Sequence, residues 1–278
     1  MIPILLLISL AVAAPAASQA IVVPVGCRGA CSLPERLPAQ FAISSVRAWA
    51  TLERGQARTS VSHVFRNAGT DTTDAAFFFP LPADATVYSV SVRDADKPAH
   101  DGSALLLYNE WSRPDESRWI LDGLVGARPR SPLQAYQGMA VVHVPVRDVP
   151  PGALRYLQIQ YTQPLRMEDG AIGYRYPLSV GAAAAPVGDL QLGVDVKTEA
   201  GFVSVGSPSH AVDVQWGTES GPCLPQERCG MRGFPSERVR VIRLKPGDNV
   251  RARDFRVVYT PRPAPPEGAE RQGMVRIP

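Results

Sequence analysis

Carboxylates and tryptophans gather in one stretch of the chain, between about residues 100 and 138. Glu110 and Trp111 are adjacent, and Trp119 and Asp122 follow a few residues later. Paired carboxylates beside aromatic platforms are typical of sites that bind or hydrolyse sugars. We therefore treat these four residues as a candidate glycan or peptide site. The alternative is a solvated loop that covers one end of the domain and uses its tryptophans as anchors.

Other arrangements that could support catalysis are missing from the sequence. The four histidines are far apart, and none has the spacing of a zinc-binding motif. His63 and His143 lie in strand-like runs, which favours a structural role for both. No Gly-x-Ser-x-Gly elbow occurs, and the segment Val205–His210 is better interpreted as a turn between strands. The sequence thus predicts a protein that is not an enzyme and has no catalytic residues, no metal and no cofactor.

Residues 1–20 resemble a signal peptide. An apolar run is followed by small residues that end in Ser18-Gln19-Ala20, so cleavage is expected to leave Ile21 as the first residue. The basic residues that usually begin a signal peptide are missing. The apolar run is nevertheless short for a membrane span, so export is favoured and an uncleaved membrane anchor is the alternative. No other stretch is long and apolar enough to predict a transmembrane helix in the mature chain. We expect an exported protein, periplasmic or secreted and of bacterial type.

Four cysteines remain for an exported chain, and an even number in that setting favours disulfides. Local pairing of Cys27 with Cys31 and of Cys223 with Cys229 is favoured because turns can close both short loops. Two long bridges between the distant pairs are the alternative, each worth roughly 4 kcal/mol on a chain-entropy argument. A zinc site is a third possibility, although the cysteine spacings differ from the usual CxxC knuckles.

Composition points to a β-rich domain. The 278 residues include 27 Pro and 23 Gly, which favour turns over helices. Basic residues are scattered and the net charge is only +3, so nucleic acid is not an expected partner. From residue 261 the chain is rich in proline, and we expect residues 261–278 to be a disordered tail.

Short runs of alternating apolar and polar residues begin after Pro38 and recur along the chain. In each run one set of side chains can enter a core while the other stays in water, as in an antiparallel β-sandwich. Tyr88, Val90 and Val92 are expected on one side of such a strand. Residues 100–138 interrupt this pattern as a long irregular excursion, with a short helix expected around residues 104–111. The main runs are 46–52, 61–65, 75–79, 86–94, 140–146, 157–161, 172–176, 190–196, 211–216, 239–244 and 254–259.

An ordered series of short motifs resembles the VIT domain (vault protein inter-alpha-trypsin domain). The series begins with an aromatic strand ending in Phe65-Arg-Asn67 and a Phe79-Pro80-Leu81-Pro82 corner. A turn at Pro150-Pro151-Gly152, a strand with Tyr161 and Leu165, and a strand at Tyr174–Leu178 follow in the same order. The resemblance covers about residues 41–178 and extends more loosely to residues 254–259. It implies a VIT-type β-sandwich over residues 41–260, preceded by an N-terminal extension at residues 21–40.

The resemblance also implies a role. VIT domains usually precede a von Willebrand factor type A domain, and this sequence contains no such domain or metal motif. We therefore expect a protein–protein interaction module, whose unknown partner could be a von Willebrand factor type A domain protein supplied in trans. A glycan-binding or glycan-hydrolysing domain is the alternative function, and a purely structural spacer is a third.

Overall fold

A computed structural model supplies the fold. It describes residues 20–25, 40–95, 106–107, 111–126, 132–178, 189–199, 201–216, 239–245 and 253–263. This part of the chain is mostly β and forms three sheets and one α-helix. The two cysteine pairs, Glu110 and residues 264–278 lie outside it.

The largest sheet has eight strands in the order β13-β14-β11-β2-β3-β8-β5-β6. Its neighbouring strands are antiparallel except for β11 and β2, which pair in parallel. The expectation of a purely antiparallel arrangement is therefore wrong at this pair, because β11 follows a crossover from another sheet and not a hairpin. The strands are β2 (Phe41–Glu53), β3 (Gln56–Asn67), β5 (Thr86–Asp94), β6 (Leu106–Leu107), β8 (Leu154–Pro164), β11 (Asp189–Lys197), β13 (Val212–Trp216) and β14 (Val239–Leu244).

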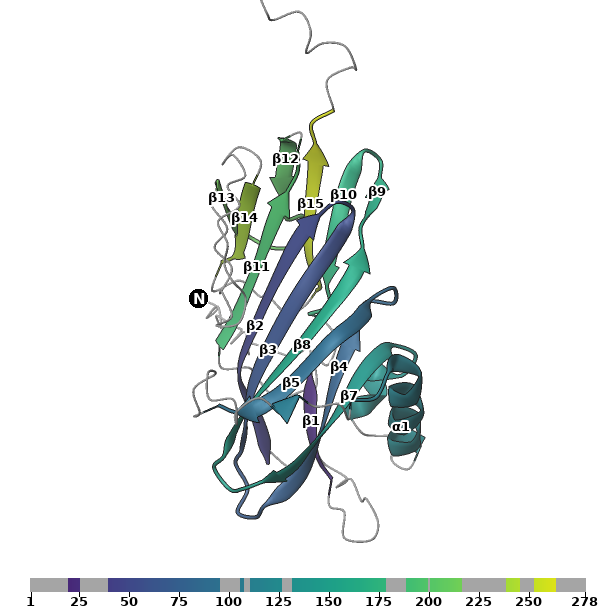
Figure 1. The fold of residues 1–278 in the computed structure, drawn as a ribbon, viewed down its shortest axis with the longest axis vertical. Coiled ribbons are helices and arrows are strands. Elements are labelled where there is room, and N and C mark those ends of the chain that lie inside the picture. The colour runs from purple at the N-terminus through teal and green to yellow at the C-terminus, as the bar shows by residue number, and fades with distance from the viewer. Residues whose placement is uncertain are drawn as a thin grey trace, which may run out of the picture.

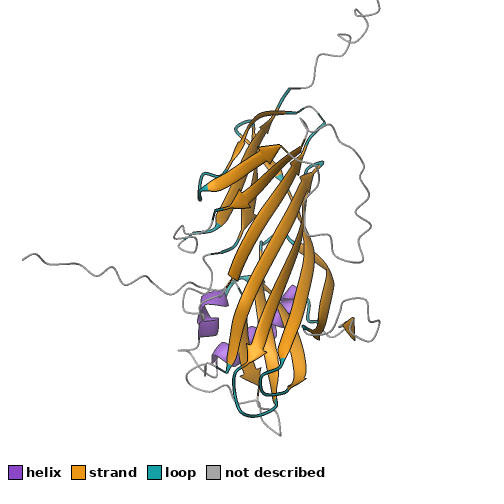
Figure 2. Ribbon diagram, turned by 90° about the vertical axis from the view of Figure 1, so that its left-hand side faces the viewer, coloured by secondary structure: helices purple, strands orange, loops and turns teal. Residues whose placement is uncertain are grey.

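Two smaller sheets pack against one face of this long sheet. In Figure 1 the four-stranded sheet, β12-β15-β10-β9, lies toward the top and the three-stranded sheet, β1-β4-β7, toward the bottom. Figure 2 shows the strands running along the length of the molecule. The main core fills the space between the layers, with Phe65, Phe77, Phe79 and Tyr161 among its largest side chains. The strands are β1 (Ile21–Val25), β4 (Thr73–Leu81), β7 (Ala140–Val149), β9 (Arg166–Glu168), β10 (Ala171–Tyr176), β12 (Phe202–Gly206) and β15 (Phe255–Pro261).

The alternation read from the sequence predicts the buried face of most long-sheet strands. Val46, Ala48, Ala50 and Leu52 of β2 are all buried in the main core. In β5, Val90 and Val92 are buried as expected, but Tyr88 is 54% exposed. The pairing of β5 with β8 shifts between Val87 and Ser89, so a bulge turns the Tyr88 side chain out of the core. The expectation for Tyr88 is therefore wrong.

Two hairpins close through pairs of residues with positive φ. Arg54 and Gly55 have φ of 49° and 74° between β2 and β3, and Asp169 and Gly170 have φ of 52° and 79° between β9 and β10. Positive φ at both central residues is the signature of the type I′ turn, whose twist matches that of the flanking strands. Glycine at the second position avoids the strain that a Cβ would bring there.

Pro80 and Pro82 of the predicted corner have different roles in the fold. Pro80 does not end strand pairing, because β4 continues to pair with β7 from Pro80 opposite Val141 to Leu81 opposite Ala140. β1 pairs with β4 as far as Phe78, where Ile21 lies opposite it, and Pro80 lies beyond that paired stretch. The turn follows at Pro82, whose carbonyl accepts a hydrogen bond from the Ala85 amide at 3.0 Å, and there the chain crosses to the long sheet.

The excursion contains a helix, but not where it was expected. Leu106 and Leu107 form strand β6, whereas helix α1 spans Pro114–Gly126 and is followed by the short 3₁₀ helix η1 (Pro132–Tyr136). Pro114 fits the first helical turn because its missing N–H is not needed there, and Asp115 and Glu116 favour the positive end of the helix dipole. The prediction of a helix at residues 104–111 is therefore wrong.

β1 is part of the packed domain, although its residues were assigned to an extension. Every residue of the segment Ala20–Pro24 is buried. Ala20 and Val22 belong to the main core, while Ile21 and Val23 face the opposite side of the three-stranded sheet. A strand at the edge of a sheet thus has both of its surfaces covered.

Candidate functional site

A second apolar cluster, the outer core, holds helix α1 on the molecule. Leu121 and Val125 are one turn apart on α1 and pack against the outer face of the three-stranded sheet, where Phe78 is fully buried. η1 contributes Leu133 and Tyr136 to the same cluster. The excursion therefore covers a sheet face and is fixed by its own hydrophobic cluster. The other members of the outer core are Ile21, Val23, Ala76 and Val141.

Ser117 adds a polar connection between α1 and β7. Its hydroxyl donates to the Ser112 carbonyl at 2.7 Å and accepts from the His143 amide at 3.0 Å. Ser112 and His143 also pair as an isolated β-bridge. Ser117 is 0% exposed, so these contacts occur away from water and fix how the helix sits on the sheet.

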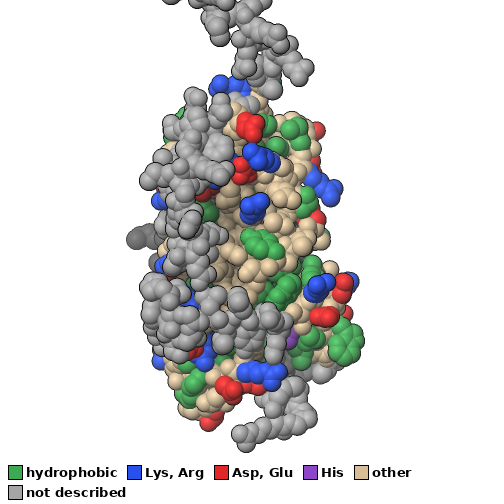
Figure 3. Space-filling view, viewed as in Figure 1, with side chains coloured by type: hydrophobic (Ala, Val, Ile, Leu, Met, Phe, Trp, Pro, Cys, Tyr) green, Lys and Arg blue, Asp and Glu red, His purple; other side chains and the backbone are tan. Residues whose placement is uncertain are grey.

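The side of α1 that faces away from the outer core carries charged residues around the exposed indole of Trp119. Trp119 is 81% exposed, an unusual state for so large an apolar side chain. Asp115, Glu116 and Asp122 are also exposed and lie three or four positions from it, so they are its neighbours on the helix surface. We call Asp115, Glu116, Arg118, Trp119 and Asp122 the α1 surface. Figure 3 shows apolar and charged side chains gathered over α1.

The residues proposed for a glycan site are thus divided between environments. Trp119 and Asp122 share the α1 surface, whereas Trp111 is partly buried against the main core. Trp111 is therefore an anchor of the excursion and Trp119 is not. Glu110 lies outside the described residues. Among the described residues no group of three or more His, Cys, Asp or Glu side chains gathers in a way that could hold a metal ion.

His63 lies fully buried inside the main core. Its ring makes edge contacts with Phe77 and Phe79, at centroid distances of 5.0 and 5.6 Å. Neither ring nitrogen has a hydrogen-bond partner in the described part of the chain. Burial penalises the charged imidazole and lowers the pKa of His63 to about 3. Burial likewise lowers the pKa of His143, which packs beside Phe78, to about 4.

Three tyrosines from β8 and β10 occupy the same interior. The hydroxyls of Tyr174 and Thr59 are hydrogen-bonded at 3.0 Å. Burial raises the pKa of Tyr174 to about 12. Burial, followed by the nearby Tyr174, raises the pKa values of Tyr161 and Tyr176 as well. All three phenols are neutral at physiological pH, so this cluster supplies no charge for chemistry.

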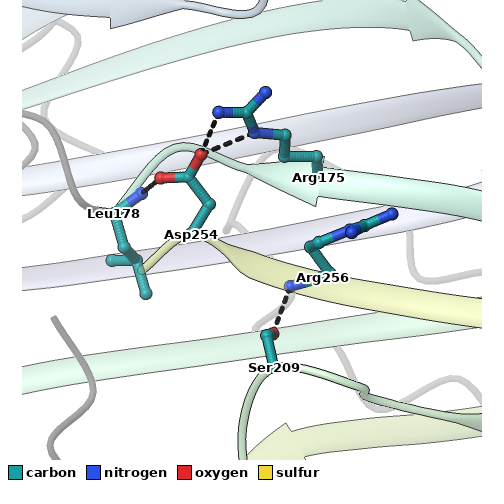
Figure 4. Close-up of polar contacts among 5 residues, drawn as sticks. All are labelled: Arg175, Leu178, Ser209, Asp254 and Arg256. Atoms are coloured by element: carbon teal, nitrogen blue, oxygen red, sulfur yellow. Dashed lines mark hydrogen bonds and ion pairs between the residues drawn. The ribbon is translucent and has the colours of Figure 1, made fainter. Parts of the chain in front are cut away.

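Polar contacts at the C-terminal end of β10 fix the chain as it leaves the sheet (Figure 4). Asp254 pairs with the Arg175 guanidinium through Oδ2 and accepts the Leu178 amide on Oδ1 at 3.1 Å. The Ser209 hydroxyl accepts the Arg256 amide at 2.8 Å and lies 2.8 Å from His210 Nδ1. The Ser209 hydroxyl thus links the turn after β12 to strand β15.

The motif residues that carried the family resemblance all lie where they shape the fold. Phe65, Phe79, Pro80, Leu81 and Tyr161 are buried, Pro82 begins the turn to β5, and Leu165 packs partly against the main core. Asn67 makes the most polar contacts of this set: its Nδ2 donates to the Asp71 and Val149 carbonyls, and its Oδ1 accepts the Gly69 amide. These residues position the strands and turns of the fold.

The fold and surface define a mostly β protein with one helix packed on the outside of its smallest sheet. No helix among the described residues is long and apolar enough to cross a membrane. No family model matches the chain, and no curated protein matches it.

Two solved structures from Legionella pneumophila are similar to this chain at low identity. One is a candidate nutrient-binding protein, with 13% identity and a TM-score of 0.41 over 87% of this chain and 72% of that chain. The other is aminopeptidase A, solved with aspartic acid, with 8% identity and a TM-score of 0.41 over 86% of this chain. The match spans only 22% of that aminopeptidase. Neither likeness assigns a family or a function.

Proposed function

We propose that this protein is an exported, non-enzymatic VIT-type domain that binds another protein at the cell envelope or outside the cell. The observation that carries the proposal is the α1 surface, where Trp119 is 81% exposed on a helix held by its own apolar cluster. Exposed tryptophans on rigid supports are typical centres of protein interfaces, because they bury a large area at little cost in conformational entropy. The motif series supports the VIT assignment.

The charge of the α1 surface suggests the chemistry of the partner. Three carboxylates, on Asp115, Glu116 and Asp122, outnumber the single guanidinium of Arg118. A partner surface with an apolar pocket rimmed by basic side chains would complement it, and would steer association through opposite charge. A von Willebrand factor type A domain carried by another chain is the partner that the resemblance suggests.

Cross-linking capture from an envelope extract tests this proposal, with the purified mature protein as bait. We expect a defined protein to be captured and, once identified and purified, to bind directly. Trp119→Ala should weaken that binding at least about tenfold, as for a central aromatic contact. Tyr88→Ala is the matched control, because Tyr88 is an exposed aromatic on β5 and not on α1. Failure to retain any envelope protein, together with turnover of a substrate, would overturn the proposal.

A glycan ligand is the second candidate, and one observation favours it. Trp119 and Asp122 lie three residues apart on the exposed side of α1, which places an aromatic platform beside a carboxylate. A glycan array with the wild type and with Trp119→Ala tests it. Trp119 is the residue to change, because loss of Trp111 would also disturb the main core. If the wild type binds no glycan, this candidate is rejected.

A further inference from the structure

The face of the long sheet that points away from the main core carries a fixed indole. Trp49 of β2 alternates with the core residues Ala48 and Ala50, so its side chain points outwards, where it is partly exposed. Its ring occupies the space where a side chain at Gly193 of the neighbouring β11 would lie, since a Cβ there would come within 1.9 Å of Trp49 Cζ3. Trp49 Nε1 donates to the carboxylate of Asp195 at 3.0 Å. The indole is thus held by the strand beside it and by a hydrogen bond at its edge.

Three arginines surround this indole. Arg47 lies two residues before Trp49 on the same face of β2. Arg58 of β3 is opposite Thr51, which makes it a diagonal neighbour of Trp49 across the two strands. The guanidinium carbon of Arg243 lies 5.9 Å from the centre of the indole. All three arginines are exposed, and none forms an ion pair with another described residue.

The carboxylates near this face have other partners. Asp195, which is only 3% exposed, accepts the indole N–H. Asp213 of β13 pairs with Lys245 at 3.1 Å, and Glu53, at the end of β2, pairs with Arg54 at 3.9 Å. The three guanidiniums therefore leave an excess of positive charge around an aromatic ring. Such a surface complements an anionic ligand that also has a flat apolar side.

Neutral hydrogen-bonding side chains extend from the indole across β3, β8 and β5, which lie side by side in Figure 1. Ser60 is directly opposite Trp49, and Gln160 and Ser89 continue the same row on the next two strands. Gln158 Nε2 donates to Ser60 Oγ at 2.7 Å. These polar side chains are all partly exposed. Hydroxyl and amide groups of this kind can pair with the hydroxyls of a sugar, while the C–H face of a sugar ring can stack on an indole.

We propose that this part of the long sheet binds an acidic glycan whose sugars carry carboxylates. One sugar ring stacks on Trp49, and the arginines bind the carboxylates through charge-assisted hydrogen bonds. The site goes beyond the proposed function and does not depend on it, because α1 packs on the three-stranded sheet. We call it the Trp49 surface, and its residues are Arg47, Trp49, Arg58, Ser60, Gln160 and Arg243.

Calorimetric titration of the purified protein with three carboxylated glycans, namely oligogalacturonate, oligomannuronate and hyaluronate fragments, tests the proposal. We expect at least one to bind, and its methyl ester, which keeps the rings and lacks the charge, to bind at least about tenfold more weakly. Polyglutamate of matched charge should also bind at least about tenfold more weakly, because it offers no sugar ring to the indole. If none of the three glycans binds, or if polyglutamate binds equally well, the proposal is wrong.

A pair of charge reversals on β3 makes the test specific to this site. Arg58→Glu should weaken glycan binding at least about tenfold, and Arg47→Glu should do the same. Arg66→Glu is the matched control, because Arg66 is exposed on the same face of β3, eight residues or roughly 27 Å from Arg58. It should change the affinity less than about twofold. Equal losses for Arg58→Glu and Arg66→Glu would show a general attraction of charge and overturn the proposal.

Two further variants complete the test. Trp49→Ala should weaken binding as strongly as the arginine changes, and its thermal unfolding is compared with that of the wild type because the indole also packs on Gly193. Loss of glycan binding in Trp119→Ala, with none in Arg47→Glu, would overturn this inference in favour of a glycan site on α1. The protein-binding proposal is judged by the captured partner, so it stands or fails separately.

Discussion

The imidazole of His63 is a buried titratable group whose two nitrogens lack protein partners in the described chain. Its pKa is lowered by burial to about 3, whereas the unfolded chain titrates near the ordinary value of 6.5. Between these two values the unfolded state binds a proton that the folded state does not. Stability is therefore lost as the pH falls from about 6.5 towards 3.

Replacement of His63 should reduce this acid sensitivity. We expect His63→Leu to have nearly wild-type stability at pH 7.5, because neither ring nitrogen has a hydrogen-bond partner among the described residues. Below about pH 6 the variant should gain on the wild type by about 1.4 kcal/mol per pH unit. Urea unfolding at a series of pH values measures the difference. A constant difference between pH 7.5 and pH 4 would contradict the buried, neutral state of His63.

The side chain of Asn67 stabilises the turn after β3 through three hydrogen bonds to the backbone. Its amide group contacts the backbone at Gly69, Asp71 and Val149 while the residue is 0% exposed. Asn67→Ala would leave those groups without partners, and we expect a loss of about 2–4 kcal/mol in urea unfolding. Thr70→Ala, an exposed change in the same turn, should change stability by less than about 0.5 kcal/mol. Similar losses for both variants would show that Asn67 has no special role.

At the scale of elements, the attachment of α1 depends on Ser117 as well as on the outer core. Ser117→Ala removes the partner of the buried His143 amide, so we expect a loss of about 1–3 kcal/mol and faster hydrogen exchange in α1. Trp119→Ala should leave both measurements unchanged, because Trp119 is 81% exposed. Unchanged exchange in Ser117→Ala would mean that the outer core alone holds the helix.

Local patterns in the sequence identify most strands and one face of each. They fail where an element departs from regular alternation, as at the bulge that turns Tyr88 outwards. The position of α1 could have been found, since Pro114 followed by Asp115 and Glu116 is a helix start signal. Leu106 and Leu107, within the range where a helix was expected, form strand β6 instead. Asp169-Gly170 is likewise a strong hairpin signal in the sequence.

The pairing and packing of segments that are distant in the sequence are harder to predict from local patterns. No local pattern in the residues of β11 or β2 predicts that the two strands pair in parallel. The continuous apolar run of β4 does signal burial on both faces, because Ala75, Phe77 and Phe79 face the main core while Ala76 and Phe78 face the outer core. The sequence could thus predict that something covers this strand on its outer side. It could not predict that helix α1 does so, or that Trp119 remains exposed.

At the scale of the whole molecule, the described residues that flank the two cysteine-bearing segments lie at opposite ends of the long sheet. Residues 26–39 connect Val25, opposite Asp74, to Gln40, which contacts Thr73, so both ends of that connection lie at one end of the sheet. β13 ends at Trp216 and β14 begins at Val239, beside Val196 and Leu52, at the other end. At about 3.4 Å per residue, the 13 residues of β2 between these ends span roughly 40 Å.

This separation favours local disulfides, Cys27 with Cys31 and Cys223 with Cys229. The long bridges would require extended connections across the sheet, at a large cost in chain entropy. Peptide mapping of the unreduced exported protein should therefore recover each pair within its own segment. A peptide that joins residue 27 or 31 to residue 223 or 229 would contradict the prediction. Free thiols with bound zinc would instead support a metal site.

The two covered surfaces of β1 have a consequence for the order in which the molecule assembles. β4, which pairs with β1, begins some fifty residues further along, and α1, whose Leu121 and Val125 complete the outer core, begins some forty residues after that. Contacts between such distant segments form late in folding, because long loops must close first. The earliest described strand to be synthesised is therefore among the last to dock. A chain that crosses a membrane unfolded would reach its finished form only after more than a hundred residues had followed β1 through.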